Sequence, residues 1–183
     1  GRELYDIEAD PSQRIDVAKQ FPEVVSRLNE YHIAWHHSLL PSMQPTRILL
    51  GSDRENPSDL TSQEWAMPVG GPPWARNHVK RRLIKNGAWK VQIDQPGRYR
   101  FELTRWPHYI EKSLESIAAG IVVAGKSAEL RITDEKQTSA VFEIDLPAGP
   151  TDLETWLETS DGKRHGAYFC RVSRIPEVAG VPA

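Results

Sequence analysis

The sequence predicts a mainly β protein, an antiparallel β-sandwich preceded by a segment of one strand and one helix. From Arg47 onward, apolar and polar residues alternate in short runs with a period of two, which is typical of strands that bury one face. Turn-forming residues separate these runs, as in sandwiches built from many short strands. The residues before this point have a helical period instead, so we divide the chain into residues 1–45 and 46–183.

The first part is expected to contain a short strand at residues 3–7, which the turn-forming residues 10–12 end. A helix is predicted to begin at Pro22, because proline is well tolerated in a first helical turn. Pro41 and Pro45 are predicted to end this helix and to form the connector. The expected apolar face of the helix has a spacing of three or four residues and consists of Val24, Val25, Leu28, Tyr31, Trp35 and Leu39.

The second part contains the alternating runs. Trp89, Val91 and Ile93 alternate with polar residues, and the same pattern resumes at residues 99–103 after a turn at residues 95–97. These two runs predict a β-hairpin with one apolar and one polar face. Later runs with the same alternation are Leu130/Ile132, Phe142/Ile144/Leu146, Leu153/Thr155/Leu157 and Tyr168/Cys170/Val172.

Two stretches of the second part do not follow this pattern. Residues 53–78 are rich in proline and aromatic residues and are predicted to form a long loop, which is unusual for a simple connector. The basic residues 80–82 lie between apolar Val79 and Leu83, and we expect them to lie on a solvated strand edge.

The composition favours an ordinary globular protein. Hydrophobic residues make up 39% and charged residues 26% of the 183 residues, and the mean hydropathy is -0.53. The longest apolar stretch, residues 117–124, is too short to cross a bilayer. A formal net charge of -2 and a pI near 6.3 give no broad positive surface for nucleic acid. We therefore expect neither a membrane nor a nucleic acid as a partner.

Two residue patterns could indicate a catalytic or metal-binding site, but each is better explained by a structural role. Cys170, the single cysteine, excludes an intramolecular disulfide, and it alternates with apolar neighbours as a small core residue does. His32 and His36 share one helical face, but Ile33 stands where the H-E-x-x-H metal motif needs glutamate. A polar helix flank is therefore the favoured interpretation, and we predict no metal site. No pair of carboxylates has a spacing typical of acid–base catalysis, so no catalytic residue is assigned.

Aromatic and polar residues between the strands are the remaining candidates for binding: Trp65, Trp74, Arg76, Asn77 and His78 in the long loop, and Trp106, His108 and Tyr109 after the second run. Exposed tryptophan faces stack on sugar rings, and arginine or histidine can bind a sulfate or carboxylate. From this set we predict substrate binding by Trp74, Arg76, His78 and Trp106. In the alternative interpretation, the tryptophans pack the loop onto the sandwich or onto a neighbouring domain.

Several segments resemble a known family. Residues 3–11, ELYDIEADP, resemble the E-L-Y-D-L-x-x-D-P sequence near the end of arylsulfatases. Residues 16–18 stand where those enzymes often have N-L-A, and residues 21–24 lead into their terminal helix. A second set of segments is similar to the extra domain at the end of some bacterial arylsulfatases: residues 86–91, 96–101, 105–107 and 162–168.

The resemblance implies the C-terminal region of a bacterial arylsulfatase, a member of the sulfatase family in the alkaline-phosphatase-like superfamily, without its catalytic core. Residues 1–45 would end the C-terminal subdomain, and residues 46–183 would form an accessory β-sandwich domain. The parent enzyme would hydrolyse sulfate esters with Ca²⁺ and formylglycine, both held by its core. Residues 170–174 resemble the C-x-P-S-R motif of formylglycine formation, but Val172 replaces the proline.

The region itself is therefore expected to be inactive and without a cofactor. Its expected partners are the N-terminal catalytic domain of the same protein and a sulfated glycan, and the family suggests a periplasmic or secreted location. The competing interpretation is a self-standing carbohydrate-binding β-sandwich module. An accessory domain would expose a contiguous apolar patch, whereas a binding module would carry a shallow aromatic groove.

Overall fold

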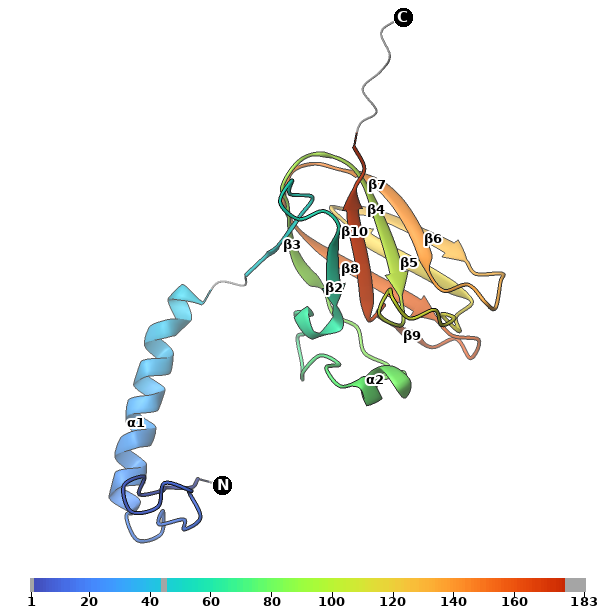
Figure 1. Ribbon diagram of the computed structural model, residues 1–183. Helices are drawn as coiled ribbons and strands as arrows, with labels where there is room; N and C mark the ends of the chain where they lie inside the picture. Colours follow the sequence, from blue (N-terminus) through green and yellow to red (C-terminus); the bar gives the residue numbers. More distant parts are fainter. Residues whose placement is uncertain (1, 44–45, 177–183) are drawn as a thin grey trace, which may run out of the picture. The chain divides into compact units, whose positions relative to one another are not determined.

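A computed structural model describes residues 2–43 and 46–176 of this chain (Figure 1). The chain divides into two compact units, Gly1–Pro45 and Thr46–Ala183. The helices and strands in chain order are α1 (Pro22–Leu39), η1 (Leu40–Ser42), β1 (Ile48–Leu50), β2 (Ser58–Thr61), η2 (Ser62–Glu64), α2 (Arg76–Lys80), β3 (Trp89–Ile93), β4 (Gly97–Thr104), β5 (Ala118–Val123), β6 (Lys126–Arg131), β7 (Ala140–Leu146), β8 (Gly149–Glu158), β9 (Arg164–His165) and β10 (Phe169–Arg174).

The second unit is a β-sandwich of two sheets (Figure 1). One sheet has the order β1-β3-β8-β5-β6, with β9 paired to β8, and the other has the order β2-β10-β4-β7. The strand pairs are antiparallel except that β1 and β3 run parallel. The predicted mainly β sandwich fold is therefore confirmed, with one parallel pair that the sequence did not indicate.

The predicted hairpin between the runs at 89–93 and 99–103 is wrong. Strand β3 pairs with β1 and β8 in one sheet, whereas β4 pairs with β10 and β7 in the other. The intervening residues carry the chain between the sheets, where the Asp94 N–H donates to the Leu50 carbonyl (3.0 Å) and the Tyr99 hydroxyl to the Gln95 carbonyl (2.6 Å). The alternation of apolar and polar residues shows which face of a strand is buried. It is the same whether two successive strands pair in one sheet or lie in two sheets that pack face to face, so it does not predict pairing.

The buried face of the predicted runs is correct, except that Leu130 in β6 is only partly buried. The largest fully buried side chains are Trp89, Tyr99, Tyr168 and Phe101, and they come from both sheets and from the segment before β10. Cys170 and Val172 are also buried, which confirms the prediction that Cys170 is a small core residue. The core is formed where the inward faces of the two sheets meet, as expected for a sandwich.

Trp65 belongs to this core rather than to a binding surface. Its side chain is 4% exposed and packs edge-on against Trp89 (5.6 Å between centroids) and nearly parallel to Tyr168 (6.1 Å). Two glycines allow this approach, since a Cβ at Gly87 would lie 2.7 Å from the Trp65 Cβ and one at Gly166 would lie 2.6 Å from the Trp65 ring. The alternative interpretation, in which a tryptophan packs the long segment onto the sandwich, is therefore correct for Trp65.

The long segment 53–78 is more regular than predicted. It contains the edge strand β2, which pairs with β10, and its last three residues form the start of α2. Leu60 is the only large apolar residue on the inward face of β2, so no alternation marks the strand in the sequence. Residues 80–82 do not lie on a strand edge as predicted, because Lys80 ends α2 and the chain then turns at Arg82, which has a positive φ of 51°.

The first unit contains the predicted helix but not the predicted strand. α1 begins at Pro22 and ends at Leu39 as expected, whereas residues 3–7 form no strand, because an isolated strand has no partner for its backbone groups. Side chains form hydrogen bonds with the backbone in place of a neighbouring strand. For example, the Asp16 carboxylate accepts a hydrogen bond from the Leu4 N–H (3.0 Å). Pro45 lies outside the described residues.

The first unit does not itself cover the predicted apolar face of α1, since none of the helix residues is buried within residues 2–43. Leu28, Tyr31 and Trp35 are about half exposed or more. None of the helices in residues 2–43 and 46–176 has the length and apolar content needed to cross a bilayer.

His165 in β9 is fully buried beside the core. Its ring stacks on Tyr168 with 5.1 Å between centroids, and its Nδ1–H donates to the Gly166 carbonyl (2.8 Å). Its Nε2 has no partner among the residues that the structure describes. Because burial penalises the charged imidazolium, the pKa of His165 is lowered to about 4.

We predict that Phe101→Ala lowers the free energy of unfolding by about 3–5 kcal/mol, because it leaves a cavity in the core. Arg100→Ala is the matched control on the outward face of the same strand and should cost less than about 1 kcal/mol. Urea denaturation of both variants tests this difference. Equal losses for the two variants would contradict the assignment of the buried face.

We also predict that His165 makes the protein less stable at mildly acidic pH. Its folded pKa of about 4 lies below the unfolded value, so between roughly pH 6.5 and 4 only the unfolded chain takes up the proton. Stability from this residue is complete above pH 6.5 and falls as the pH is lowered, by about 3 kcal/mol in all. In His165→Phe, this part of the pH dependence should be absent from urea denaturation curves. An unchanged slope in the variant would exclude His165 as its source.

Candidate functional site

A cavity of about 410 Å³ lies at one end of the four-stranded sheet, where β2 and β4 end and β10 begins. Its walls come from η2, from the segment leading into α2, from the loop after β4, and from the first residue of β10. We call it the aromatic cavity. Its lining residues are Thr61, Ser62, Gln63, Pro73, Trp74, Ala75, Arg76, Val79, Lys80, Trp106, Pro107, Tyr109, Ile110, Lys112 and Phe169.

The structure brings together three of the four predicted binding residues, since Trp74, Arg76 and Trp106 all line this cavity. His78 is not among the lining residues. Its Nδ1 accepts from the backbone N–H groups of Trp74 (3.2 Å) and Ala75 (3.3 Å), and its ring packs edge-on against Trp74 with 5.6 Å between centroids. His78 therefore supports the segment that carries Trp74 and starts α2.

Trp74 is the most accessible tryptophan of the site. Its side chain is 70% exposed, so the interpretation that it packs the loop onto the sandwich is wrong for this residue. The only ring contact recorded for Trp74 among the described residues is the edge-on one with His78. An indole held in this way presents apolar area to a ligand without first having to leave a packed core.

Trp106 is held more firmly. Its ring is partly buried, with the guanidinium carbon of Arg105 4.8 Å and the Nζ of Lys112 4.9 Å from its centroid. The Thr104 hydroxyl donates to the Trp106 carbonyl (2.6 Å), which fixes the backbone where β4 ends. The alternative packing interpretation thus applies in part to Trp106, which also forms one wall of the cavity.

The aromatic cavity is positively charged. Arg76, Lys80 and Lys112 line it, and no carboxylate does. Within residues 2–43 and 46–176, none of these three cations forms an ion pair. Like charges in a concave, partly apolar site attract an anion more strongly than the same charges dispersed on a flat surface.

Two walls of the cavity are joined by a group of three charged residues, Arg82, Arg105 and Glu115, which we call the arginine clasp. The Arg105 guanidinium is 5% exposed, donates to the Glu115 carboxylate, and also donates to the carbonyls of Val79 (3.3 Å) and Lys80 (3.1 Å). It therefore fixes the C-terminal end of α2 to the loop that follows β4.

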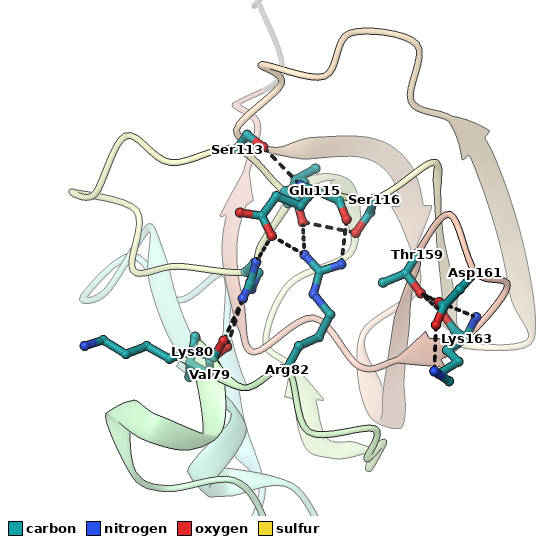
Figure 2. A network of polar contacts seen from close by, with 11 residues as sticks. Val79, Lys80, Arg82, Ser113, Glu115, Ser116, Thr159, Asp161 and Lys163 are labelled. Carbon is teal, nitrogen blue, oxygen red and sulfur yellow. Dashed lines mark hydrogen bonds and ion pairs between the residues drawn. The ribbon is translucent and has the colours of Figure 1, made fainter.

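Arg82 completes the clasp from the other side. Its guanidinium donates to the Glu115 carbonyl (2.6 Å), to the Leu114 carbonyl (3.0 Å) and to the Glu115 carboxylate (3.0 Å), as Figure 2 shows for Arg82 and Glu115. Burial, with the neighbouring charge of Arg105, lowers the pKa of Arg82. Figure 2 also shows the separate group of Thr159, Asp161 and Lys163, which closes the turn after β8.

Several lining residues were missed by sequence reasoning, among them Gln63, Lys80, Lys112 and Phe169. The outward position of Phe169 could have been predicted, because the alternation at residues 168, 170 and 172 places those side chains inward and residue 169 on the outward face. Lys80 and Lys112 had none, since a surface lysine has no characteristic spacing. Of the remaining candidates, Tyr109 lines the cavity, whereas Asn77 and His108 do not.

Cys170 and the pair His32 and His36 were the other candidates for chemistry. Burial raises the pKa of the Cys170 thiol, which keeps it protonated and unreactive. The ring centroids of His32 and His36 are 6.3 Å apart, and no group of three potential metal ligands occurs in the part of the chain that the structure describes.

Comparison with known proteins supplies similar folds but no family. No protein-family model matches the chain, and no curated protein matches it. The fold is similar to part of a ruminal GH26 endo-β-1,4-mannanase, at 14% identity and a TM-score of 0.41, with 69% of this chain and 28% of that chain covered.

Two further similar structures have names that concern carbohydrates. The CBM35 from Cellvibrio japonicus Abf62 matches at 12% identity and a TM-score of 0.32, over 68% of this chain and 94% of that chain. A GH2 β-galacturonidase from Eisenbergiella tayi, bound to galacturonate, matches at 13% identity and a TM-score of 0.35, over 70% of this chain and 27% of that chain. None of the three is named as a sulfatase. All three TM-scores lie below 0.5.

We predict that Arg105→Ala loosens the cavity and destabilises the protein. The variant leaves two backbone carbonyls and the Glu115 carboxylate without their buried donor, which should lower the free energy of unfolding by about 1–3 kcal/mol. Arg98→Ala, which removes an exposed ion pair with Glu143, should cost less than about 1 kcal/mol. Denaturant unfolding of both variants makes the comparison. If the two losses are the same, the clasp does not join the walls.

Proposed function

We propose that residues 46–183 form a carbohydrate-binding β-sandwich module whose aromatic cavity binds an acidic sugar, either sulfated or carboxylated. The observation that carries this proposal is the combination of exposed Trp74 with Arg76, Lys80 and Lys112 in one cavity that has no carboxylate in its lining. Such a sugar has an apolar ring face and a fixed negative charge. In this cavity, Trp74 can contact the ring face, and the three cations can bind the charge.

The chemistry of the individual residues supports this ligand class. The Trp74 indole presents a flat apolar face of the kind that stacks on the C–H groups of a pyranose ring. The Arg76 guanidinium has paired N–H donors that match a carboxylate or sulfate group. A cavity of about 410 Å³ lies within the range of roughly 300–1,000 Å³ typical of small-molecule sites.

The arginine clasp supports binding in a different way. It fixes α2, which carries Arg76 and Lys80, relative to the loop that carries Trp106 and Lys112. Groups that are held in place before the ligand arrives lose little conformational entropy on binding. The backbone segments that carry the cations are therefore preorganised for a ligand.

The first test is titration of the full chain with a heparin-derived disaccharide at low salt, followed by tryptophan fluorescence. Arg76→Ala should weaken binding at least about tenfold, because it removes a charge-assisted hydrogen bond. Trp74→Ala should weaken binding and remove most of the fluorescence change. Binding should also weaken as salt is added.

Two variants control for general effects. Arg54→Ala removes an exposed arginine outside the cavity, and Trp35→Ala removes an exposed tryptophan from the first unit. Neither should change the affinity. Binding that is insensitive to Arg76→Ala and Trp74→Ala, or equally sensitive to the controls, would contradict the proposed function.

A second candidate function concerns the first unit. The apolar side chains of α1 that the first unit leaves exposed favour docking onto a folded domain, and we propose the catalytic domain of an arylsulfatase, which the ELYDIEADP resemblance implies. This function is compatible with the module proposed above, since a binding domain can direct an enzyme to a sulfated glycan.

Sequencing the natural coding region upstream of Gly1 tests this second candidate. A C-x-P-S-R motif in the same reading frame is expected, because sulfatases make formylglycine from its cysteine. An upstream region without that motif would refute the sulfatase assignment and leave the carbohydrate-binding proposal unaffected.

A further inference from the structure

A second cavity of about 270 Å³ adjoins the aromatic cavity. The two share four wall residues, Thr61, Pro107, Tyr109 and Phe169, so a ligand that occupies one reaches the border of the other. Most of its lining is apolar, and we call it the polar cavity only after three of the side chains in its wall, those of Asp59, His108 and Arg171. Its remaining lining residues are Asp59, Leu60, Thr104, His108, Cys170 and Arg171.

The charges of the polar cavity differ from those of the aromatic cavity. Asp59 lies opposite Arg171 in the β2–β10 ladder, and His108 lies on the loop after β4. The carboxylate of Asp59 balances the guanidinium of Arg171, so this cavity does not accumulate positive charge. It is therefore suited to hydroxyl groups rather than to a second anion.

The three polar side chains leave hydrogen-bonding groups free. Asp59 Oδ1 lies 3.6 Å from His108 Nδ1 and 3.8 Å from Arg171 Nε, which are separations of ion pairs and not of hydrogen bonds. Across the described chain, none of the three side chains makes a hydrogen bond of ordinary length. A hydroxyl placed between them can donate to Asp59 and accept from Arg171 at the same time.

We propose that the polar cavity is a second subsite, which binds the hydroxyl groups of the sugar unit next to the acidic one. The inference rests on the proposed function, because the acidic unit must first occupy the aromatic cavity. Tyr109 and Phe169, which both cavities share, form the border that the glycosidic linkage crosses. The site accordingly recognises an acidic unit joined to a neighbour that presents its hydroxyls, and a lone acidic sugar occupies only the aromatic cavity.

The experiment compares one sugar unit with two. Galactose 6-sulfate and 6′-sulfated lactose, whose second unit is an uncharged glucose, are titrated by NMR into the full chain, and the ratio of their dissociation constants measures the contribution of the second unit. In the unmodified protein, the disaccharide should bind at least about tenfold more tightly, as one or two hydrogen bonds to charged groups imply.

Asp59→Ala and Arg171→Ala form a matched pair, because they change the local charge in opposite directions. A purely electrostatic effect would strengthen anion binding in Asp59→Ala and weaken it in Arg171→Ala. Loss of hydroxyl contacts instead lowers the ratio toward one in both variants. Asp145→Ala, an exposed aspartate on β7 of the same sheet, should leave the ratio unchanged.

The outcomes separate this inference from the proposed function. A monosaccharide that binds without any gain from the second unit, or a ratio that is unchanged in both variants, overturns the second subsite and leaves the proposed function standing. Opposite shifts of the ratio in the two variants also overturn it. If neither probe binds the unmodified protein, the proposed function fails and the second subsite fails with it.

Discussion

The buried guanidinium of Arg105 lies one residue beyond β4, where the sandwich ends and the aromatic cavity begins. Removing this charge from water is costly, and the cost is offset by the Glu115 carboxylate and by the two carbonyls at the end of α2. The same contacts fix α2 against the sheet, and the next residue, Trp106, forms the facing wall. The positions of the residues that carry the cations therefore depend on the buried Arg105 guanidinium and its partners.

The sandwich supplies the rigid base for this arrangement. Inward faces of both sheets are filled by large apolar side chains, while the outward face of the four-stranded sheet stays polar along β2 and β10. Phe169 interrupts that polar face at the point where the two cavities meet. A rigid sheet with ligand-binding residues on its connecting loops is a common arrangement, because the loops can vary while the core does not.

The alternation of apolar residues was sufficient to predict the fold class and the buried side of β3, β4, β7, β8 and β10. It could not predict pairing, which is why the supposed hairpin proved to be a crossing between sheets. β2 escaped notice because Leu60 alone marks its inward face. Trp74, Arg76 and Trp106 were predicted from residue type, but their meeting in one cavity depends on the clasp, whose members are far apart in sequence. His78 was predicted to bind substrate because an imidazole can bind an anion. In the structure, its imidazole instead accepts hydrogen bonds from backbone N–H groups.

The central claim is that the aromatic cavity binds an acidic sugar. Its most direct test is a ¹H–¹⁵N spectrum of the six indole N–H groups, recorded while a heparin-derived disaccharide is added to the full chain. The signals of Trp74 and Trp106 are predicted to shift in a saturable manner, while those of Trp35, Trp65, Trp89 and Trp156 stay in place. Saturable shifts confined to tryptophans outside the cavity, or no shifts at all, would contradict the account.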